Sequence, residues 1–181
     1  MWPLEDWLAQ VNRKLLENLR VKRNLSILGS VPARHAINCV QVKCSLTLDN
    51  EVQEIKFNDE VLVVEGQLND WSQKKSIAFK SCDIDNPGKL VIKGRDWNTN
   101  NNCKMGGLLL HCSASDTTNP WHNFKSGIEN WKDENGDDPC QNDLLFPAYG
   151  RTYPFIQDLN TLGAKKIWAP RQNVVLTGTP V

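Results

Sequence analysis

Apolar and polar residues alternate with a period of two over much of the chain after residue 43. Cys44, Leu46 and Leu48 share one face of such a run, and the same spacing recurs in Ile55 and Phe57, Val61 and Val63, Ile77 and Phe79, and Leu90 and Ile92. Turn-forming residues separate the runs, at Asp49-Asn50, Asn58-Asp59, Asn69-Asp70 and Asn86-Pro87-Gly88. Strand character returns at Ile167-Trp168 and Val174–Leu176. The pattern predicts a mainly β protein, an antiparallel β-sandwich of short strands.

The first part of the chain has a helical period instead. Leu4, Leu8, Val11, Leu15 and Leu19 recur every three to four residues, after a proline at position 3. We expect one amphipathic helix over residues 3–23, whose apolar stripe docks on its own domain or on a partner. The predicted domains are therefore residues 1–37, a helix and linker, and residues 38–181, the β-sandwich. An oligomer formed through the helix is one consequence.

Six cysteines, an even number, occur without any C-x-x-C spacing, which favours disulfides over zinc. The candidates are Cys39, Cys44, Cys82, Cys103, Cys112 and Cys140. Fifteen pairings are open. The start of the sequence lacks the features of a signal peptide, whereas Asn24-Leu25-Ser26 is a glycosylation sequon. We expect a secreted or extracellular protein.

Charge and hydropathy exclude two classes of partner. The 21 basic residues balance the 21 acidic ones, so the field that attracts nucleic acid is missing. Apolar runs such as Val61–Val64 and Leu108–Leu110 are far shorter than the roughly 20 residues of a membrane span. We expect neither a nucleic-acid partner nor a membrane span.

Two long polar segments, residues 94–107 and 113–143, carry aromatic residues among Asn and Asp. Loops of this length in a compact domain are usually functional or tied down, and Cys103, Cys112 and Cys140 lie in or beside them. Aromatic faces beside amide and carboxylate groups suit sugar binding, with stacking on the ring and hydrogen bonds to the hydroxyls. The predicted ligand-binding residues are Asp96, Trp97, Asn100, Asn102, Asp116, Trp121, His122 and Asn123. The alternative is that a loop tryptophan folds onto the core, as we expect for Trp131 and Trp168.

An acidic run offers oxygen ligands at alternate positions. Asp133, Asn135, Asp137 and Asp138 predict a calcium loop, although residue 144 is a leucine where an EF-hand requires a glutamate. A solvated acidic turn is the alternative. We expect no required cofactor, with calcium as the one candidate metal.

Catalytic patterns are weak. Ser113 and Ser115 follow His111 without a glycine elbow, and Glu129, Asp133 and Glu134 show no sign of a converging carboxylate pair. We expect a non-enzyme, with a small secreted hydrolase using His111 or Glu129 as the alternative.

Several motifs occur in a familiar order along residues 40–178. They are Leu46-Thr47-Leu48-Asp49-Asn50, Ile55-Lys56-Phe57-Asn58-Asp59, Asp70-Trp71, Leu90–Asp96, Gly106–Leu110, Asn130-Trp131-Lys132 and Lys166–Ala169. In this order they resemble galactose-binding-domain-like jelly-roll modules, which accompany rhamnosidase-like glycosidases and occur in multidomain extracellular proteins. The Asp-Asp-Ser-Trp element of such modules is replaced here by Asp133–Cys140 and Leu144–Pro147.

This resemblance implies a jelly-roll fold, and related modules often hold a structural calcium. We therefore expect a carbohydrate-binding, lectin-like module whose partner is a glycan or a cell-surface glycoprotein, with the 96–102 and 116–138 loops forming the binding face. The alternative is a structural or cell-adhesion module that binds another protein and assembles through the N-terminal helix.

Overall fold

A computed structural model describes residues 39–97, 106–142 and 153–180 of the chain. The chain divides into two units, residues 1–37 and 38–181, and the described residues belong to the second. The predicted helix over 3–23, the sequon at Asn24 and Cys103 lie outside the described residues.

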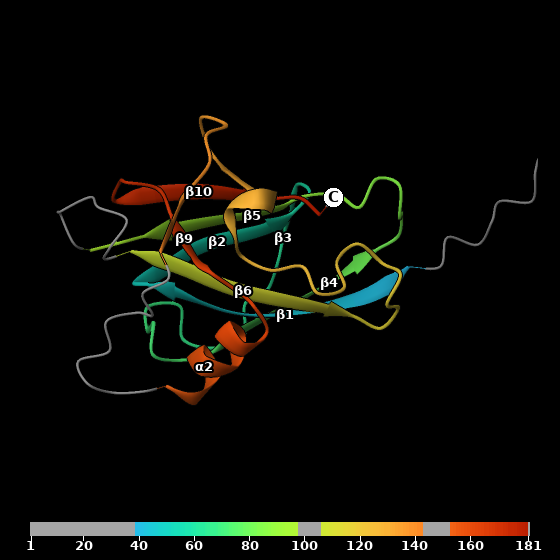
Figure 1. Ribbon diagram of the computed structural model, residues 1–181, viewed down its shortest axis with the longest axis horizontal. Helices are drawn as coiled ribbons and strands as arrows, with labels where there is room; N and C mark the ends of the chain where they lie inside the picture. The colour runs from blue at the N-terminus through green and yellow to red at the C-terminus, as the bar shows by residue number, and fades with distance from the viewer. Residues whose placement is uncertain (1–38, 98–105, 143–152, 181) are drawn as a thin grey trace, which may run out of the picture. The chain divides into compact units, whose positions relative to one another are not determined.

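Ten strands of the described residues form two antiparallel sheets of five strands each (Figure 1). Sheet A has the order β4 (Lys75–Ser81), β1 (Val40–Asp49), β6 (Gly107–Ala114), β9 (Lys166–Trp168) and β8 (Cys140–Asn142). Sheet B has the order β3 (Glu60–Val61), β2 (Glu51–Phe57), β5 (Leu90–Arg95), β10 (Asn173–Gly178) and β7 (Trp131–Asp133). A short 3-10 helix, Ile128–Asn130, precedes β7, and helix α2, Pro154–Thr161, precedes β9. The prediction of a mainly β, antiparallel protein is confirmed.

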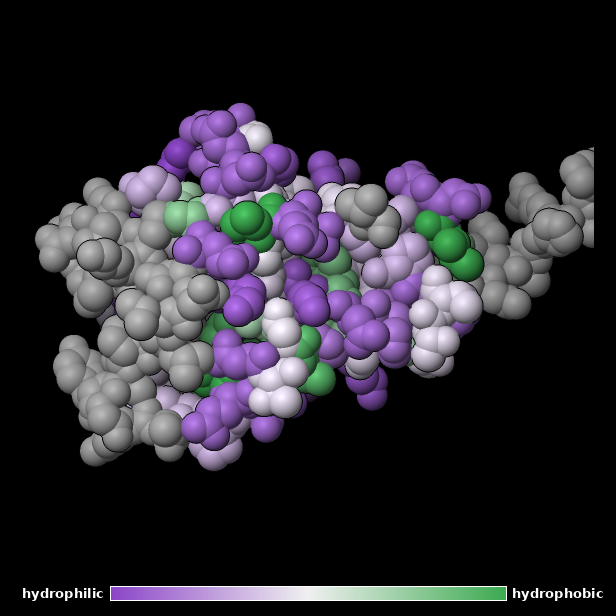
Figure 2. Space-filling model, viewed as in Figure 1, coloured by the Kyte–Doolittle hydropathy of each residue, from purple (hydrophilic) through white to green (hydrophobic). Residues whose placement is uncertain are grey.

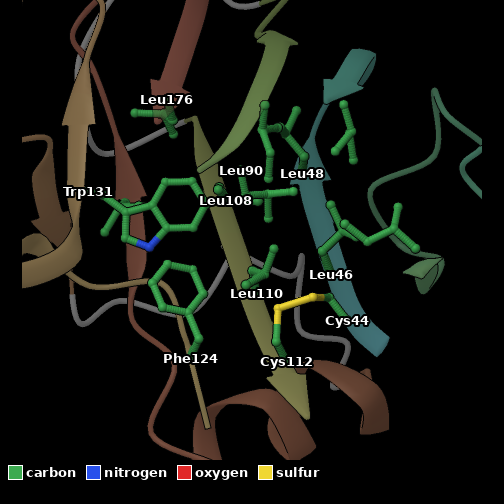
Figure 3. Packing of buried hydrophobic residues seen from close by; sticks show 14 of the residues in the cluster. Cys44, Leu46, Leu48, Leu90, Leu108, Leu110, Cys112, Phe124, Trp131 and Leu176 are labelled. Carbon is green, nitrogen blue, oxygen red and sulfur yellow. A yellow bond between two sulfur atoms is a disulfide. The ribbon is translucent and has the colours of Figure 1, made fainter. Parts of the chain in front are cut away.

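The core lies between the two sheets, in a β-sandwich-like arrangement (Figure 3). Leu46 and Leu48 of β1 and Leu108 and Leu110 of β6 are fully buried against residues of sheet B such as Leu176. Trp131 and Trp168 are buried in the same cluster, as predicted. The inward faces of β1, β4 and β5 agree with the period-two pattern, because Ile77, Phe79, Leu90 and Ile92 are all buried.

One strand prediction was wrong in its face. Val61 and Val63 are 59% and 83% exposed, whereas their neighbours Leu62 and Val64 pack against the core. The segment leaves sheet B after β3 and reaches sheet A at a bridge between Glu65 and Ser76. This change of sheet exchanges the inward and outward residues relative to the expected alternation.

Disulfides hold sheet A together, which confirms the prediction of disulfide bonding. Cys39 pairs with Cys82 at the end of the β1–β4 ladder, and Cys44 of β1 pairs with Cys112 of β6 inside the core (Figure 3). Cys140 is also disulfide-bonded. The Cys44–Cys112 bridge therefore joins two neighbouring strands, although Cys112 was expected to tie down a loop.

Helix α2 covers part of the outer face of sheet A. Its residues Ile156 and Leu159 pack with Leu109, the outward-facing leucine of β6, and Trp71 packs edge-on against Tyr153 just before the helix. The sequence pattern did not predict this helix. On the face that Figure 2 shows, the described surface is mostly hydrophilic, and hydrophobic residues appear only in small separate groups.

The tight packing of the two sheets leads to a stability prediction at Gly94 of β5. A Cβ added at Gly94 would lie 2.6 Å from Cδ1 of Leu48, a fully buried side chain. We expect Gly94→Ala to lower the free energy of unfolding by about 1–3 kcal/mol, measured by urea denaturation. The control is Gly127→Ala, because Gly127 has extended backbone and its nearest neighbour, Oε1 of Gln141, would lie 3.9 Å from the new Cβ. Equal stability of the two variants would contradict this description of the core.

Candidate functional site

The predicted binding face is divided between two ends of the two-sheet body. The register of β1 and β6 pairs Asp49 with Gly107 at one end and Val42 with Ala114 at the other. Asp96 and Trp97 lie at the first end, because the backbone of Trp97 bonds to Asn50, whereas residues 116–123 follow Ala114 at the second. The eight residues of β6 separate the ends by roughly 25 Å at the usual rise per residue. The expectation of a single face was therefore wrong for residues 116–123. The acidic turn after Asp133 is nearer to Asp96, because Asp133 pairs with Arg171 and the neighbouring Gln172 accepts the backbone hydrogen bond of Asp96.

Trp121 is a core residue, which corrects its assignment as a ligand contact. It is fully buried, its ring packs edge-on against Phe79 and Phe124, and its indole N–H donates to the carbonyl of Pro87 at 2.7 Å. No face of the ring is open to a sugar. This is the alternative considered for a loop tryptophan.

The polar residues beside Trp121 stabilise the turns around it. The carboxylate of Asp116 accepts hydrogen bonds from the backbone and hydroxyl of Thr118, and these bonds lower the pKa of Asp116. Nδ1 of His122 lies 3.1 Å from the carbonyl oxygen of Ala114. Asn123 has a positive φ of 63°, and its backbone N–H donates to Cys112. These contacts give Asp116, His122 and Asn123 structural roles.

The opposite end carries an exposed aromatic ring held in place by its neighbours. Trp97 is 53% exposed, its backbone N–H donates to Oδ1 of Asn50 at 2.6 Å, and its indole N–H lies 3.5 Å from Oε2 of Glu51. Asn50 is itself fixed, since its backbone N–H donates to the carbonyl of Arg95 and its side-chain amide donates to Asp49. We call Asp49, Asn50, Glu51, Asp96 and Trp97 the Trp97 end. The other two predicted ligand residues near it, Asn100 and Asn102, lie outside the described residues.

Buried charges lie behind the exposed ring. Asp96 is buried, and its backbone N–H donates to the carbonyl of Gln172 at 2.8 Å. Burial, and to a smaller extent the nearby Asp96, raise the pKa of Asp49 to about 7 against the opposing effect of Lys166 and Lys75. Burial likewise lowers the pKa values of Lys166 and Lys75. This end therefore combines two carboxyl groups, those of Asp49 and Asp96, with two buried lysines. The raised pKa of Asp49 lies near neutral pH.

The acidic run near residue 133 forms a hydrogen-bonded turn. Oδ1 of Asp133 accepts from the backbone N–H groups of Asn135 at 2.8 Å and Asp137 at 3.0 Å. Its Oδ2 pairs with Arg171 at 3.1 Å, while Asp138 pairs with Lys132. Within the described part of the chain, no group of three or more His, Cys, Asp or Glu side chains is placed to hold a metal ion. Calcium binding stays a prediction, and the structure gives the oxygens of Asp133 another use.

Asp49, Asn50 and Glu51 are members of the site that no sequence pattern predicted. The sequence predicts Asp49-Asn50 as a turn between strands and as the end of the motif Leu46–Asn50, and neither pattern shows that the chain crosses to the other sheet there. Lys166 could have been found from the sequence. A lysine directly before the apolar pair Ile167-Trp168 is rarely buried unless a charged group pairs with it, so its position indicates a nearby carboxylate.

Comparison with known proteins adds no assignment. The chain matches no protein-family model, and neither the curated proteins nor the solved structures contain a match. None of the helices among the described residues is long and apolar enough to cross a membrane.

The raised pKa of Asp49 predicts a specific pH dependence of stability. Its carboxyl group stays protonated in the folded protein up to about pH 7, but the unfolded chain releases the proton near the ordinary aspartate pKa of 3.8. The folded state then binds more protons, so this group makes folding less favourable as the pH rises from about 4 to 7. We expect Asp49→Asn to match the wild type at pH 4 and to exceed its stability at pH 8 by up to a few kcal/mol.

Urea denaturation at pH 4, 6 and 8 measures this difference. Asn can still accept the hydrogen bond that Asn50 donates to Asp49, so the variant isolates the charge. Asp59→Asn, which removes a carboxylate from an exposed turn, is the control. Parallel pH profiles for Asp49→Asn and the wild type would show that Asp49 has no raised pKa.

Proposed function

We propose that this chain is an extracellular, non-catalytic binding module that takes a carbohydrate at the Trp97 end. The observation that carries this proposal is the half-exposed indole of Trp97, whose backbone N–H donates to Asn50 and whose indole N–H lies beside Glu51. An exposed tryptophan that is fixed before binding loses little entropy when a ligand stacks on it. A sugar ring can place its C–H face on the indole while its hydroxyl groups reach the polar side chains around it.

Two charged side chains flank the ring and suit hydroxyl groups. Glu51 of β2 is opposite Arg95 of β5 in sheet B, and Trp97 follows Arg95 by two residues. A carboxylate accepts and a guanidinium donates, so adjacent hydroxyl groups of one sugar can bond to both. Their opposite charges also leave the site without a strong preference for charged sugars.

The surrounding fold supports a rigid module. Two five-stranded antiparallel sheets with disulfides across β1–β4 and β1–β6 are compatible with the jelly-roll, galactose-binding-like module that the sequence resembles. Disulfides are typical of an oxidising, extracellular environment. A glycan or a cell-surface glycoprotein is the partner that this combination favours.

A glycan array tests the proposal. We expect the wild-type chain to give a sugar-selective signal and Trp97→Ala to weaken binding to the selected glycan by at least about fivefold, because stacking contributes about 1 kcal/mol or more. Trp97→Phe should retain part of the signal, since an aromatic face remains. Ile84→Ala is the matched control, because Ile84 is 54% exposed in a different loop.

The array also separates the alternatives. Loss of signal in a calcium chelator would add a metal to the site, and unchanged signal would leave the acidic turn a structural element. A blank array with the wild type would contradict carbohydrate binding and favour the protein-binding, adhesion alternative.

A further inference from the structure

The edge of sheet A at β4 has unpaired backbone groups. Ser76 of β4 exchanges both backbone hydrogen bonds with Glu65, on the side away from β1. In an antiparallel strand these groups alternate in direction, so the N–H and C=O groups of Ala78 and Lys80 also point away from β1. Within the described residues, none of these four groups has a hydrogen-bond partner.

The segment that could cover this edge turns away from it. After the bridge at Glu65, an antiparallel ladder would place Val63 beside Ala78 and Val61 beside Lys80. Instead, Val61 pairs with Lys56 of β2, and Leu62 donates its backbone N–H to Ile55 of the same strand. The segment after β3 therefore bonds to sheet B at this point, and it does not pair with Ala78 of β4.

A groove of about 570 Å³ occupies this space. It is lined by residues of β1, β4 and the 60–65 segment, among them Lys43, Ser76, Ala78, Val61 and Val63. The charged residues Glu60, Glu65 and Lys74 also line it. The side chains of the two valines are 59% and 83% exposed. Two exposed aliphatic side chains so close together in the sequence are unusual on this surface. The groove therefore combines an apolar wall with free backbone donors and acceptors.

The charges around the edge indicate the side chains that would fit. Ala78 and Lys80 present their side chains on the outer face of sheet A, beside Lys43 and Gln41 of β1. Both lysines are exposed, and neither is in an ion pair among the described residues. The two carboxylates of the groove, Glu60 and Glu65, belong to the 60–65 segment and not to β1 or β4. A strand bound here would place alternate side chains on the outer face beside these lysines and the others toward the core.

We propose that the β4 edge binds an extended segment of another protein, with alternating acidic and aliphatic side chains, as an added antiparallel strand. The segment donates to and accepts from the backbone of Ala78 and Lys80, its acidic side chains lie beside Lys80 and Lys43, and its aliphatic side chains point toward the core. Addition of a strand to an open sheet edge is an established form of peptide recognition. The site is separate from the Trp97 end and does not depend on carbohydrate binding.

A synthetic peptide, Val-Glu-Val-Glu-Val with blocked ends, tests the proposal by isothermal titration calorimetry with the full chain. The glutamates oppose Ala78 and Lys80, so their N–H groups face β4. N-methylation of both glutamates should weaken binding at least about tenfold, because two hydrogen bonds are lost, whereas N-methylation of the central valine should have little effect. The lysine-containing peptide Val-Lys-Val-Lys-Val should bind more weakly than the glutamate peptide.

Two variants test the protein side. Ala78→Pro removes an N–H group that β1 does not use, so it should reduce peptide binding at least about tenfold while thermal unfolding shows that the chain still folds. Lys80→Glu leaves the backbone intact and should reverse the preference toward the lysine-containing peptide. Trp97→Ala should leave peptide binding unchanged, which separates this site from the carbohydrate site.

Several results would overturn the proposal. Absence of peptide binding to the wild type would show that Lys80 serves only to keep the edge free. Equal weakening by both patterns of N-methylation would exclude strand addition. A concentration-dependent dimer abolished by Ala78→Pro would show that a second copy of this chain occupies the edge instead.

Discussion

The packing of β1 between its two neighbours and against sheet B determines where every other element lies. Leu46 and Leu48 are fully buried, and Gly94 of β5 approaches Leu48 so closely that a Cβ at this position would displace the leucine side chain. Directly after Leu48 the chain leaves sheet A at Asp49-Asn50 and begins β2 of sheet B. This crossing brings Asn50 beside Trp97, so the geometry of the proposed binding end follows from the packing of the core.

Local pattern was sufficient for strands whose two faces differ in burial. In β1, β4 and β5 the alternation in the sequence matches the buried residues, because each strand keeps one face on the core throughout its length. The prediction was wrong at Val61 and Val63, where the chain changes sheets and the inward residues shift by one position. Helix α2 was not predicted because it buries only Ile156 and Leu159, too few residues for a helical period to be recognised.

The candidate site could be predicted only in part, because it depends on contacts between segments that are distant in the sequence. Composition identified Asp96 and Trp97, since an aromatic residue among polar residues is visible in the sequence. The same criterion selected Trp121, which is buried by contacts with Phe79 of β4 and Phe124, residues that are brought together by the fold. The coupling of Asp49 with Asp96, Lys166 and Lys75 joins four segments of the chain, and no spacing along the sequence indicates it.

The two proposed surfaces differ in what recognises the ligand, and this difference follows from their positions. At the Trp97 end the strands terminate, so recognition depends on side chains that Asn50 and the buried charges behind it hold in place. At the β4 edge the strand continues, so the backbone recognises the ligand and Lys80 supplies selectivity. The Cys39–Cys82 and Cys44–Cys112 disulfides fix β4 and β6 to β1, which orders the edge before any ligand binds. Because the ligand then does not have to order the sheet, even the few hydrogen bonds available at Ala78 and Lys80 can contribute to affinity.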